Sequence, residues 1–300
     1  MKQVIVLLVL IAAVHGLGSW KSGLRVRFDL NPLGFGKSSF ISLPRTVSEA
    51  KHARWVETPR PHGPMPSLIL FCPSTIDKLT CAMYDETGYI AGLQFALPTD
   101  EYTSTSGMDM NTLGYTLWTP PVTSGSVRSY WTAQQYYVDE EFLEKSVEER
   151  LAERNPKKTI QGDYVWVTSF GGNRMAIPTD GNAIADSAKT FFTKQSCFIM
   201  MGRHYFYNMT TLTPCDSEHI LPWFALVHSG ELIGVGFLTI GQLPSNNLPR
   251  DYFERNTRKN VELIIKNGPE CIFDLVDREG IVTVHTYFVD HPWLIDCIGQ

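Results

Sequence analysis

The sequence predicts an α+β protein that consists mainly of antiparallel β-sheet, with short peripheral helices and a disulfide frame. Two hairpin patterns support this prediction, because a turn ending in Gly88 or Gly230 separates two apolar runs. A third observation is the strand-like alternation of residues 280–294, which has a weaker counterpart at residues 131–143. Six cysteines provide the expected disulfide frame.

The two hairpins and the two strands indicate an internal duplication. Each hairpin follows a pair of cysteines and precedes a Tyr-aromatic-Val-Asp strand, which ends at Asp139 or Asp290. A shared glycine turn alone is common among unrelated hairpins, but three landmarks in the same order are hard to obtain by chance. The units either share one core or form two lobes. The expected boundaries are a signal peptide at 1–16, an N-terminal segment with a short helix at 17–59, repeat unit one at 60–154, a connector at 155–185 and repeat unit two at 186–300.

The chain begins with a predicted signal peptide. Lys2 precedes an apolar run from Val4 to Val14, and a polar, turn-rich segment follows Gly16. Spanning a membrane takes roughly 20 apolar residues, and this run is shorter. We therefore expect cleavage near Gly16, secretion, and no membrane anchor in the mature chain.

Short helices are expected at the periphery of the sheet. Thr46 and Glu49 form a capping-box pattern that predicts a helix start. A charged helix is expected at 139–154, with Asp139 as its N-cap, and another helix at 180–192. Residues 261–265 are compatible with a strand or a helix, and we favour a strand.

The mature chain is mildly acidic. Its formal charge changes from −5 to −6 when the signal peptide, which contains Lys2, is removed. Without a basic face to neutralise phosphates, nucleic acid and anionic membranes are unfavourable partners.

The even number of cysteines predicts three disulfides. A zinc site is the alternative, but no C-x-x-C pair is present. The sequence does not fix their connectivity, and pairing nearest neighbours gives the simplest pattern, which is Cys72–Cys81, Cys197–Cys215 and Cys271–Cys297.

The sequon Asn208-Met209-Thr210 predicts a glycan on Asn208.

His285 is one of two histidines that could support chemistry. Alternation places Thr283, His285 and Tyr287 on one face of their strand, opposite Val284. A hydrogen-bonded structural histidine is the default interpretation, with a pocket residue as the alternative. The counterpart of His285 in the first unit is Gln134, which cannot act as a general base.

The second candidate, His204, lies in a run rich in aromatic residues and methionine at residues 197–208. Methionines beside a histidine are typical of copper sites, but a buried strand with methionines filling gaps is the more common arrangement. Asp290 could belong to an acid/base pair in a glycosidase-like cleft, although a turn or cap is the simpler role. The expected pocket residues are Tyr136, Tyr205 and Tyr287.

Four short segments of the sequence carry a resemblance to other proteins, and they are Asn31–Phe35, Ser42–Thr46, Met201–Asn208 and Tyr287–Asp290. With these segments the chain resembles a loosely defined group of secreted invertebrate proteins that has no assigned function. The resemblance covers most of the mature chain and implies no reaction, cofactor or catalytic residue.

We expect a secreted, non-enzymatic glycoprotein that binds a small ligand or an extracellular partner, without a cofactor. One alternative is a secreted hydrolase or metal-dependent enzyme that uses His204 and His285. This alternative requires the two histidines within about 5 Å of each other and of a third ligand or carboxylate in one pocket. The other alternative is a matrix or egg-coat structural protein. No P-loop, G-x-S-x-G or EF-hand motif is present in the sequence.

Overall fold

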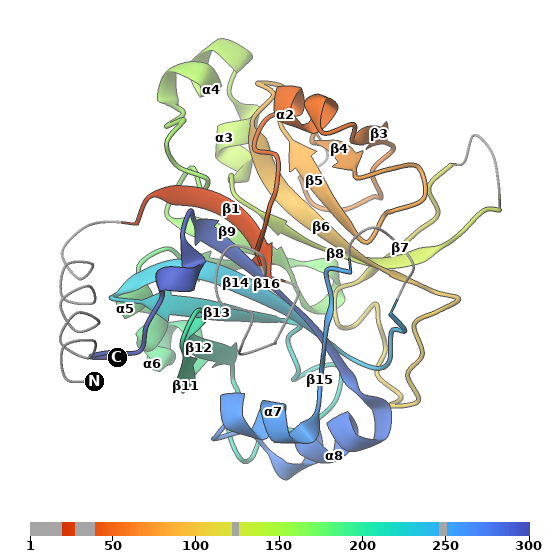
Figure 1. The fold of residues 1–300 in the computed structure, drawn as a ribbon, viewed down its shortest axis with the longest axis vertical. Helices are drawn as coiled ribbons and strands as arrows, with labels where there is room; N and C mark the ends of the chain where they lie inside the picture. The colour runs from red at the N-terminus through yellow and green to blue at the C-terminus, as the bar shows by residue number, and fades with distance from the viewer. Residues whose placement is uncertain (1–19, 28–39, 66, 122–125, 246–250) are drawn as a thin grey trace, which may run out of the picture.

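The computed structural model describes residues 20–27, 40–65, 67–121, 126–245 and 251–300. The expected signal peptide lies outside these residues. The described part of the chain forms two antiparallel sheets of eight strands each, which pack against each other (Figure 1). The prediction of a mainly antiparallel β protein with short helices and three disulfides is therefore confirmed.

Sheet one contains the strands from the first half of the chain together with two strands that follow them. Its order is β3-β4-β5-β6-β8-β9-β10, and β7 pairs with β8 off this path. The strands are β3 (Val56–Thr58), β4 (Ile69–Cys72), β5 (Thr80–Tyr84), β6 (Ile90–Pro98), β7 (Thr116–Trp118), β8 (Tyr130–Tyr136), β9 (Tyr164–Thr168) and β10 (Arg174–Pro178).

Sheet two contains the strands from the second half together with the first two strands of the chain. Its order is β11-β12-β13-β14-β16-β1-β2, and β15 pairs with β16 off this path. The strands are β1 (Ser22–Arg27), β2 (Phe40–Ser42), β11 (Phe192–Phe198), β12 (Gly202–Tyr207), β13 (Trp223–His228), β14 (Glu231–Ile240), β15 (Glu254–Asn256) and β16 (Ile281–Val289).

The two sheets follow the same plan, so that strands whose numbers differ by eight occupy equivalent places. The registers agree as well, because Gly92 lies opposite Tyr136 in sheet one and Gly234 lies opposite Tyr287 in sheet two. Only the hairpins β1–β2 and β9–β10 are exchanged, since β1 pairs with β16 and β9 pairs with β8.

The short helices after β2 and β10 also occupy equivalent places. Helix α2 (Val47–His52) begins with Val47 N–H donating to Gly88 O at 2.9 Å. Helix α5 (Gly181–Ala185) begins with Gly181 N–H donating to Gly230 O at 2.9 Å. Both acceptors end a hairpin turn with φ near +80°, a conformation that favours glycine.

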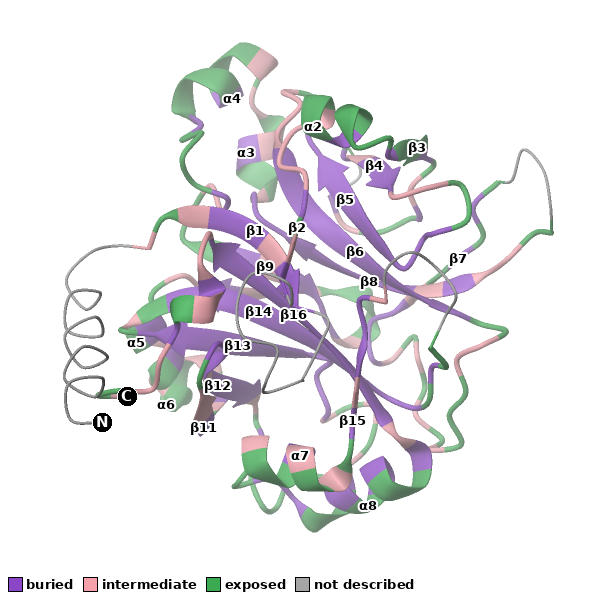
Figure 2. Ribbon diagram, viewed as in Figure 1, coloured by how far each residue is buried: buried purple, intermediate pink, exposed green. Residues whose placement is uncertain are grey.

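Equivalent residues of the two sheets contact each other across the shared core. The rings of Phe95 and Phe237 stack with centroids 5.5 Å apart, and Gln135 Nε2 donates to Thr286 Oγ1 at 2.9 Å. Apolar residues of both sheets form this central core, and a second apolar cluster lies on the outer face of each sheet. Figure 2 shows the strands largely buried between exposed helices and loops.

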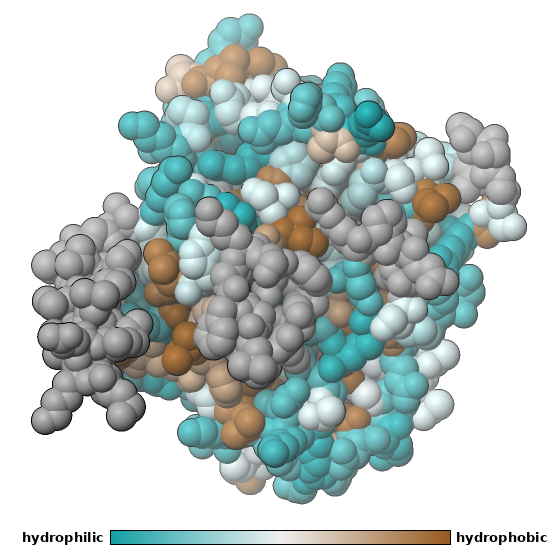
Figure 3. Space-filling view, in the orientation of Figure 1, coloured by the Kyte–Doolittle hydropathy of each residue, from teal (hydrophilic) through white to brown (hydrophobic). Residues whose placement is uncertain are grey.

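Two helices cover the outer face of sheet two, α7 (Arg258–Ile264) and α8 (Glu270–Glu279). The strand predicted at 261–265 is therefore wrong. Residues 261–264 belong to α7, whose buried residue Val261 packs with Ile265 in the outer cluster. The outward side of both helices is mostly hydrophilic (Figure 3).

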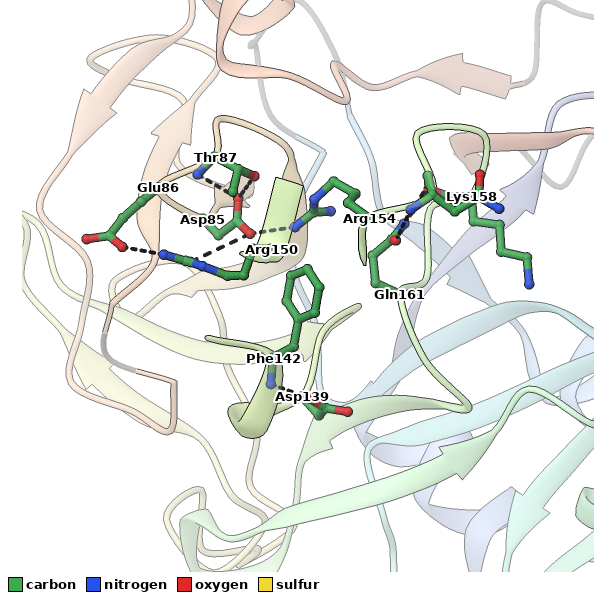
Figure 4. Close-up of polar contacts among 10 residues, drawn as sticks. Asp85, Glu86, Thr87, Asp139, Phe142, Arg150, Arg154, Lys158 and Gln161 are labelled. Atoms are coloured by element: carbon green, nitrogen blue, oxygen red, sulfur yellow. Dashed lines mark hydrogen bonds and ion pairs between the residues drawn. The ribbon is translucent and has the colours of Figure 1, made fainter. Parts of the chain in front are cut away.

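The charged segment after β8 forms two helices rather than the single helix predicted. Asp139 caps α3 (Glu140–Glu144) as expected, but Ser146 starts a new capping box and begins α4 (Val147–Glu153). Two arginines bind this segment to the β5–β6 turn (Figure 4). Arg154 donates to Asp85 at 2.5 Å, and Arg150 donates to Glu86 at 2.5 Å.

One of the three predicted disulfide pairs is present in the structure, and the other two are wrong. Cys72–Cys81 joins β4 to β5 as predicted, with a Cα–Cα distance of 4.3 Å. The pairs Cys197–Cys215 and Cys271–Cys297 are wrong, because the C-terminal segment returns to the end of β11 and α8 packs beside the loop after β12. The observed pairs are Cys197–Cys297 and Cys215–Cys271. Within the described residues, no helix is long and apolar enough to cross a membrane.

Candidate functional site

His204 and His285 meet on the outer face of sheet two. Their ring centroids lie 5.8 Å apart, and their exposed fractions are 0% and 2%. His204 is on β12 and His285 is on β16, so two strands separate them. The ring of Phe224 packs against both, with centroids 5.5 Å from His204 and 5.2 Å from His285.

A glycine on β14 makes this arrangement possible. A Cβ atom added to Gly236 would lie 1.9 Å from the Phe224 ring, so any larger residue would displace that ring. The close approach of the two histidines therefore depends on the absence of a side chain at this position.

A buried carboxylate from β15 completes the cluster. Glu254 Oε2 lies 3.1 Å from His285 Nδ1 and accepts a hydrogen bond from Thr283 Oγ1 at 3.2 Å. The guanidinium of Arg27, on β1, approaches Glu254 Oε1 at 3.8 Å. We refer to His204, His285, Glu254 and Arg27 as the histidine cluster; each member is at most 3% exposed.

The two histidines differ in the hydrogen bonding of Nδ1 but share an unpaired Nε2 within the described residues. His204 Nδ1 lies 3.2 Å from the carbonyl oxygen of Ser196, and His285 Nδ1 faces Glu254 without an aligned hydrogen bond. Within the described residues, neither Nε2 atom has a hydrogen-bond partner, and neither does Asn256 Oδ1. Leaving such atoms unpaired in the interior costs about 1–3 kcal/mol each.

The pKa of His204 is lowered to about 3, mainly by burial and to a smaller extent by the neighbouring His285 and Arg27. Backbone hydrogen bonds to Ser196 and Gly202 oppose this shift. His204 is therefore a neutral imidazole at neutral pH, with a lone pair on one ring nitrogen.

The cavity between the histidines and α7 is small. Its volume is about 20 Å³, which is room for one water-sized particle but not for an organic substrate. In the parts of the chain that are described, no group of three or more His, Cys, Asp or Glu side chains could hold a metal ion. The lining residues are His204, Phe206, Phe224, Leu238, Asn256, Val261, Ile264, Ile265, Ile281, Thr283 and His285.

The other predicted site residues lie elsewhere. Asp290 forms ion pairs with Arg25 at 2.9 Å and Lys21 at 3.2 Å after the end of β16. The hydroxyls of Tyr136 and Tyr287 donate to the carbonyl oxygens of Pro64 and Met200, both at 3.1 Å, so these rings are anchored structural elements.

Tyr205, the third predicted pocket residue, is only 5% exposed but lines a depression of about 310 Å³ beside the C-terminus. Lys194 and Arg203 supply positive charge to the same depression. Of the predicted pocket residues, only Tyr205 borders an open space of this size among those described.

Sequence reasoning missed Glu254, Asn256 and Arg27. Glu254 and Asn256 occur in a polar segment without alternation, and Arg27 belongs to an N-terminal stretch that shows no sign of pairing with β16. Their roles arise because β15 and β1 lie near His285 in sheet two. No local signal in the sequence could have identified them.

At the positions equivalent to the histidine cluster, sheet one carries neutral residues. The matching registers place Leu70 where sheet two has His204, and Gln134 where it has His285. Thr116 and Thr168 occupy the positions of Glu254 and Arg27. Gln134 Nε2 donates to Gln94 Oε1 at 3.3 Å and to Thr132 Oγ1 at 3.1 Å.

A much larger cleft lies where the β2–α2 segment meets the β4–β5 loop. Its volume is about 540 Å³. Burial lowers the pKa of Arg45 in this cleft, while the carboxylate of Glu49 opposes the shift. The cleft is lined by Ser42, Leu43, Pro44, Arg45, Glu49, Ala53, Trp55, Pro73, Ser74, Asp77 and Tyr252.

Comparisons with models of known protein families, with curated proteins and with solved structures found no match. The function is therefore inferred from the geometry of the two sites.

Proposed function

We propose that this chain is a secreted extracellular protein that binds a small polar ligand in the cleft around Arg45. The observation that carries the proposal is the cleft itself, whose volume of about 540 Å³ lies in the usual range for small-molecule sites. Arg45 and Glu49 offer opposite charges to a ligand, and Trp55 offers an aromatic wall. The cavity of the histidine cluster is too small for this role.

The three disulfides support the extracellular location, because such bonds persist in oxidising compartments. Asn208 is exposed immediately after β12, where an oligosaccharide has room to be attached. A secreted chain should show cleavage near Gly16 by N-terminal sequencing. Its mass should also fall on deglycosylation, but not in the Asn208→Gln variant.

We also propose that the chain arose by duplication and that the two units exchanged their first hairpins. The eight-strand offset, the matching registers and the core contacts between equivalent residues support this origin. In this proposal the units begin at β1 and β9 and end at β8 and β16. Both begin earlier in the chain than the cysteine and hairpin landmarks suggest.

The ligand proposal can be tested by a thermal-shift screen of small polar compounds on the full mature protein. Compounds that raise the melting temperature should lose their effect in Arg45→Leu and Trp55→Leu. Lys194→Ala changes the depression near Tyr205 and serves as the matched control that retains binding. Compounds that stabilise the Arg45→Leu and Trp55→Leu variants as strongly as the parent protein would show that the cleft is not the binding site.

A further inference from the structure

We propose that His204 and His285 together bind one copper or zinc ion through their Nε2 atoms, in the cavity beneath α7. This inference goes beyond the ligand cleft, because it concerns a separate site on the outer face of sheet two. Imidazole nitrogen is a preferred ligand of both ions. The cavity of about 20 Å³, which both histidines line, has room for an ion of this size.

The first argument is the orientation of the imidazole rings. Histidines that bind metal usually direct the other ring nitrogen at a carboxylate or a backbone carbonyl, which fixes the proton on that nitrogen. His285 Nδ1 faces Glu254 at 3.1 Å, and His204 Nδ1 faces the Ser196 carbonyl at 3.2 Å. Both Nε2 atoms are buried without a hydrogen-bond partner within the described residues, and with the proton on Nδ1 each would offer a lone pair to an ion.

The second argument is the separation of the rings. A metal–nitrogen bond of about 2.0–2.1 Å places two ring centroids about 5.3 Å apart at a tetrahedral ion and about 6.4 Å apart at a linear one. The centroids of His204 and His285 are 5.8 Å apart, which lies inside this interval. The two side chains therefore need little movement to share an ion.

The third argument is the remaining donor at the cavity. Asn256 Nδ2 donates to Thr283 Oγ1 at 2.9 Å, which sets the direction of the amide, and Asn256 Oδ1 is buried without a partner within the described residues. Two imidazoles and one amide oxygen make a site of low coordination number. The other lining residues are apolar, so the site disfavours hydrated Ca²⁺ or Mg²⁺, which require several oxygen ligands.

Sheet one provides an internal comparison. The equivalent positions there are occupied by Leu70, Gln134 and two threonines, so the fold does not require ionisable groups at these positions. Buried charges are costly unless they are compensated. Their presence at these positions in sheet two alone therefore indicates a role other than stability, and Glu254 Oε2 lies 3.1 Å from His285 Nδ1.

The test is metal binding to the full mature protein after removal of bound metal by a chelator. Zn²⁺ would be titrated against a zinc indicator, and Cu⁺ against a chromophoric Cu⁺ chelator under reducing conditions. We expect one ion per chain, with affinity at least about 100-fold lower in His204→Leu and His285→Gln, which carry the residues found in sheet one. The second-sphere variant Glu254→Gln should lose about 10–100-fold.

His219→Gln is the matched control, because His219 is partly exposed and pairs with Asp216 away from the cluster. Its affinity should equal that of the parent protein. Failure of both ions to bind at one per chain, or unchanged affinity in His204→Leu, would overturn the proposal. If the cluster variants do not fold, X-ray absorption at the metal edge of the loaded parent protein decides, since fewer than two imidazole ligands would also overturn it.

Discussion

Arg154→Leu tests whether the buried ion pair beside the β5–β6 turn holds α4 in place. The side chains of Arg154 and Asp85 are 3% and 0% exposed, and Arg154 Nη2 lies 2.5 Å from Asp85 Oδ2. Removing one partner of a buried pair costs about 3–5 kcal/mol, because the other charge remains in the interior. Thr87 also donates twice to Asp85, and Arg150 remains at 3.8 Å. We therefore expect the free energy of unfolding to fall by about 3 kcal/mol, near the lower end of this range.

The assay is urea unfolding followed by circular dichroism, with the disulfides kept intact. The double variant Arg154→Leu/Asp85→Asn should recover about 2 kcal/mol relative to the sum of the single changes, since it removes both charges. Lys145→Ala is the matched control. It breaks an exposed pair with Glu153 on the same pair of helices and should change the free energy of unfolding by less than about 1 kcal/mol.

Two results would refute this reasoning. A loss in Arg154→Leu no larger than that in Lys145→Ala would mean that the pair is effectively solvated. Strict additivity in the double variant would mean that Asp85 and Arg154 stabilise the fold independently of each other.

Three further changes should alter stability in ways that the structure specifies. Gly236→Ala should destabilise the protein by about 1–3 kcal/mol in urea unfolding, because the new Cβ would meet the Phe224 ring; an unchanged midpoint would contradict the packing around the histidines. Cys215→Ser/Cys271→Ser opens a link across a sequence separation of 56 and should cost about 4 kcal/mol by loop entropy, whereas a variant as stable as the parent in non-reducing urea titrations would argue against that pairing. In the metal-free protein, the folded pKa of His204 is about 3, below its unfolded value of about 6.5, so the unfolded chain takes up a proton first as the pH falls. Stability from this group is complete above about pH 6.5 and should fall by about 2 kcal/mol at pH 5; His204→Leu should flatten this part of the pH profile, and an equal slope in both proteins would show that other groups cause it.

Local features of the structure could be predicted because they depend on short-range chemistry. Alternation correctly separated Val284, which packs in the shared core, from His285 and Tyr287 on the outer face. Side-chain caps were correct at Thr46 and Asp139, since each accepts a hydrogen bond from a backbone N–H three residues on. Residues 261–265 were misassigned because a short apolar run carries no decisive period.

The candidate site was predicted only in part, because some of its residues are brought together by contacts between distant parts of the chain. The sequence by itself determined the central strands β5, β6, β8, β13, β14 and β16, the two hairpin turns between them and the two candidate histidines. Only the tertiary structure decided that Glu254 and Arg27 join them, that Cys197 pairs with Cys297, and that the β1–β2 hairpin completes the sheet of the other half. Period and turn chemistry act over a few residues, whereas these contacts depend on which sheet edges meet, and no local pattern in the chain encodes that choice.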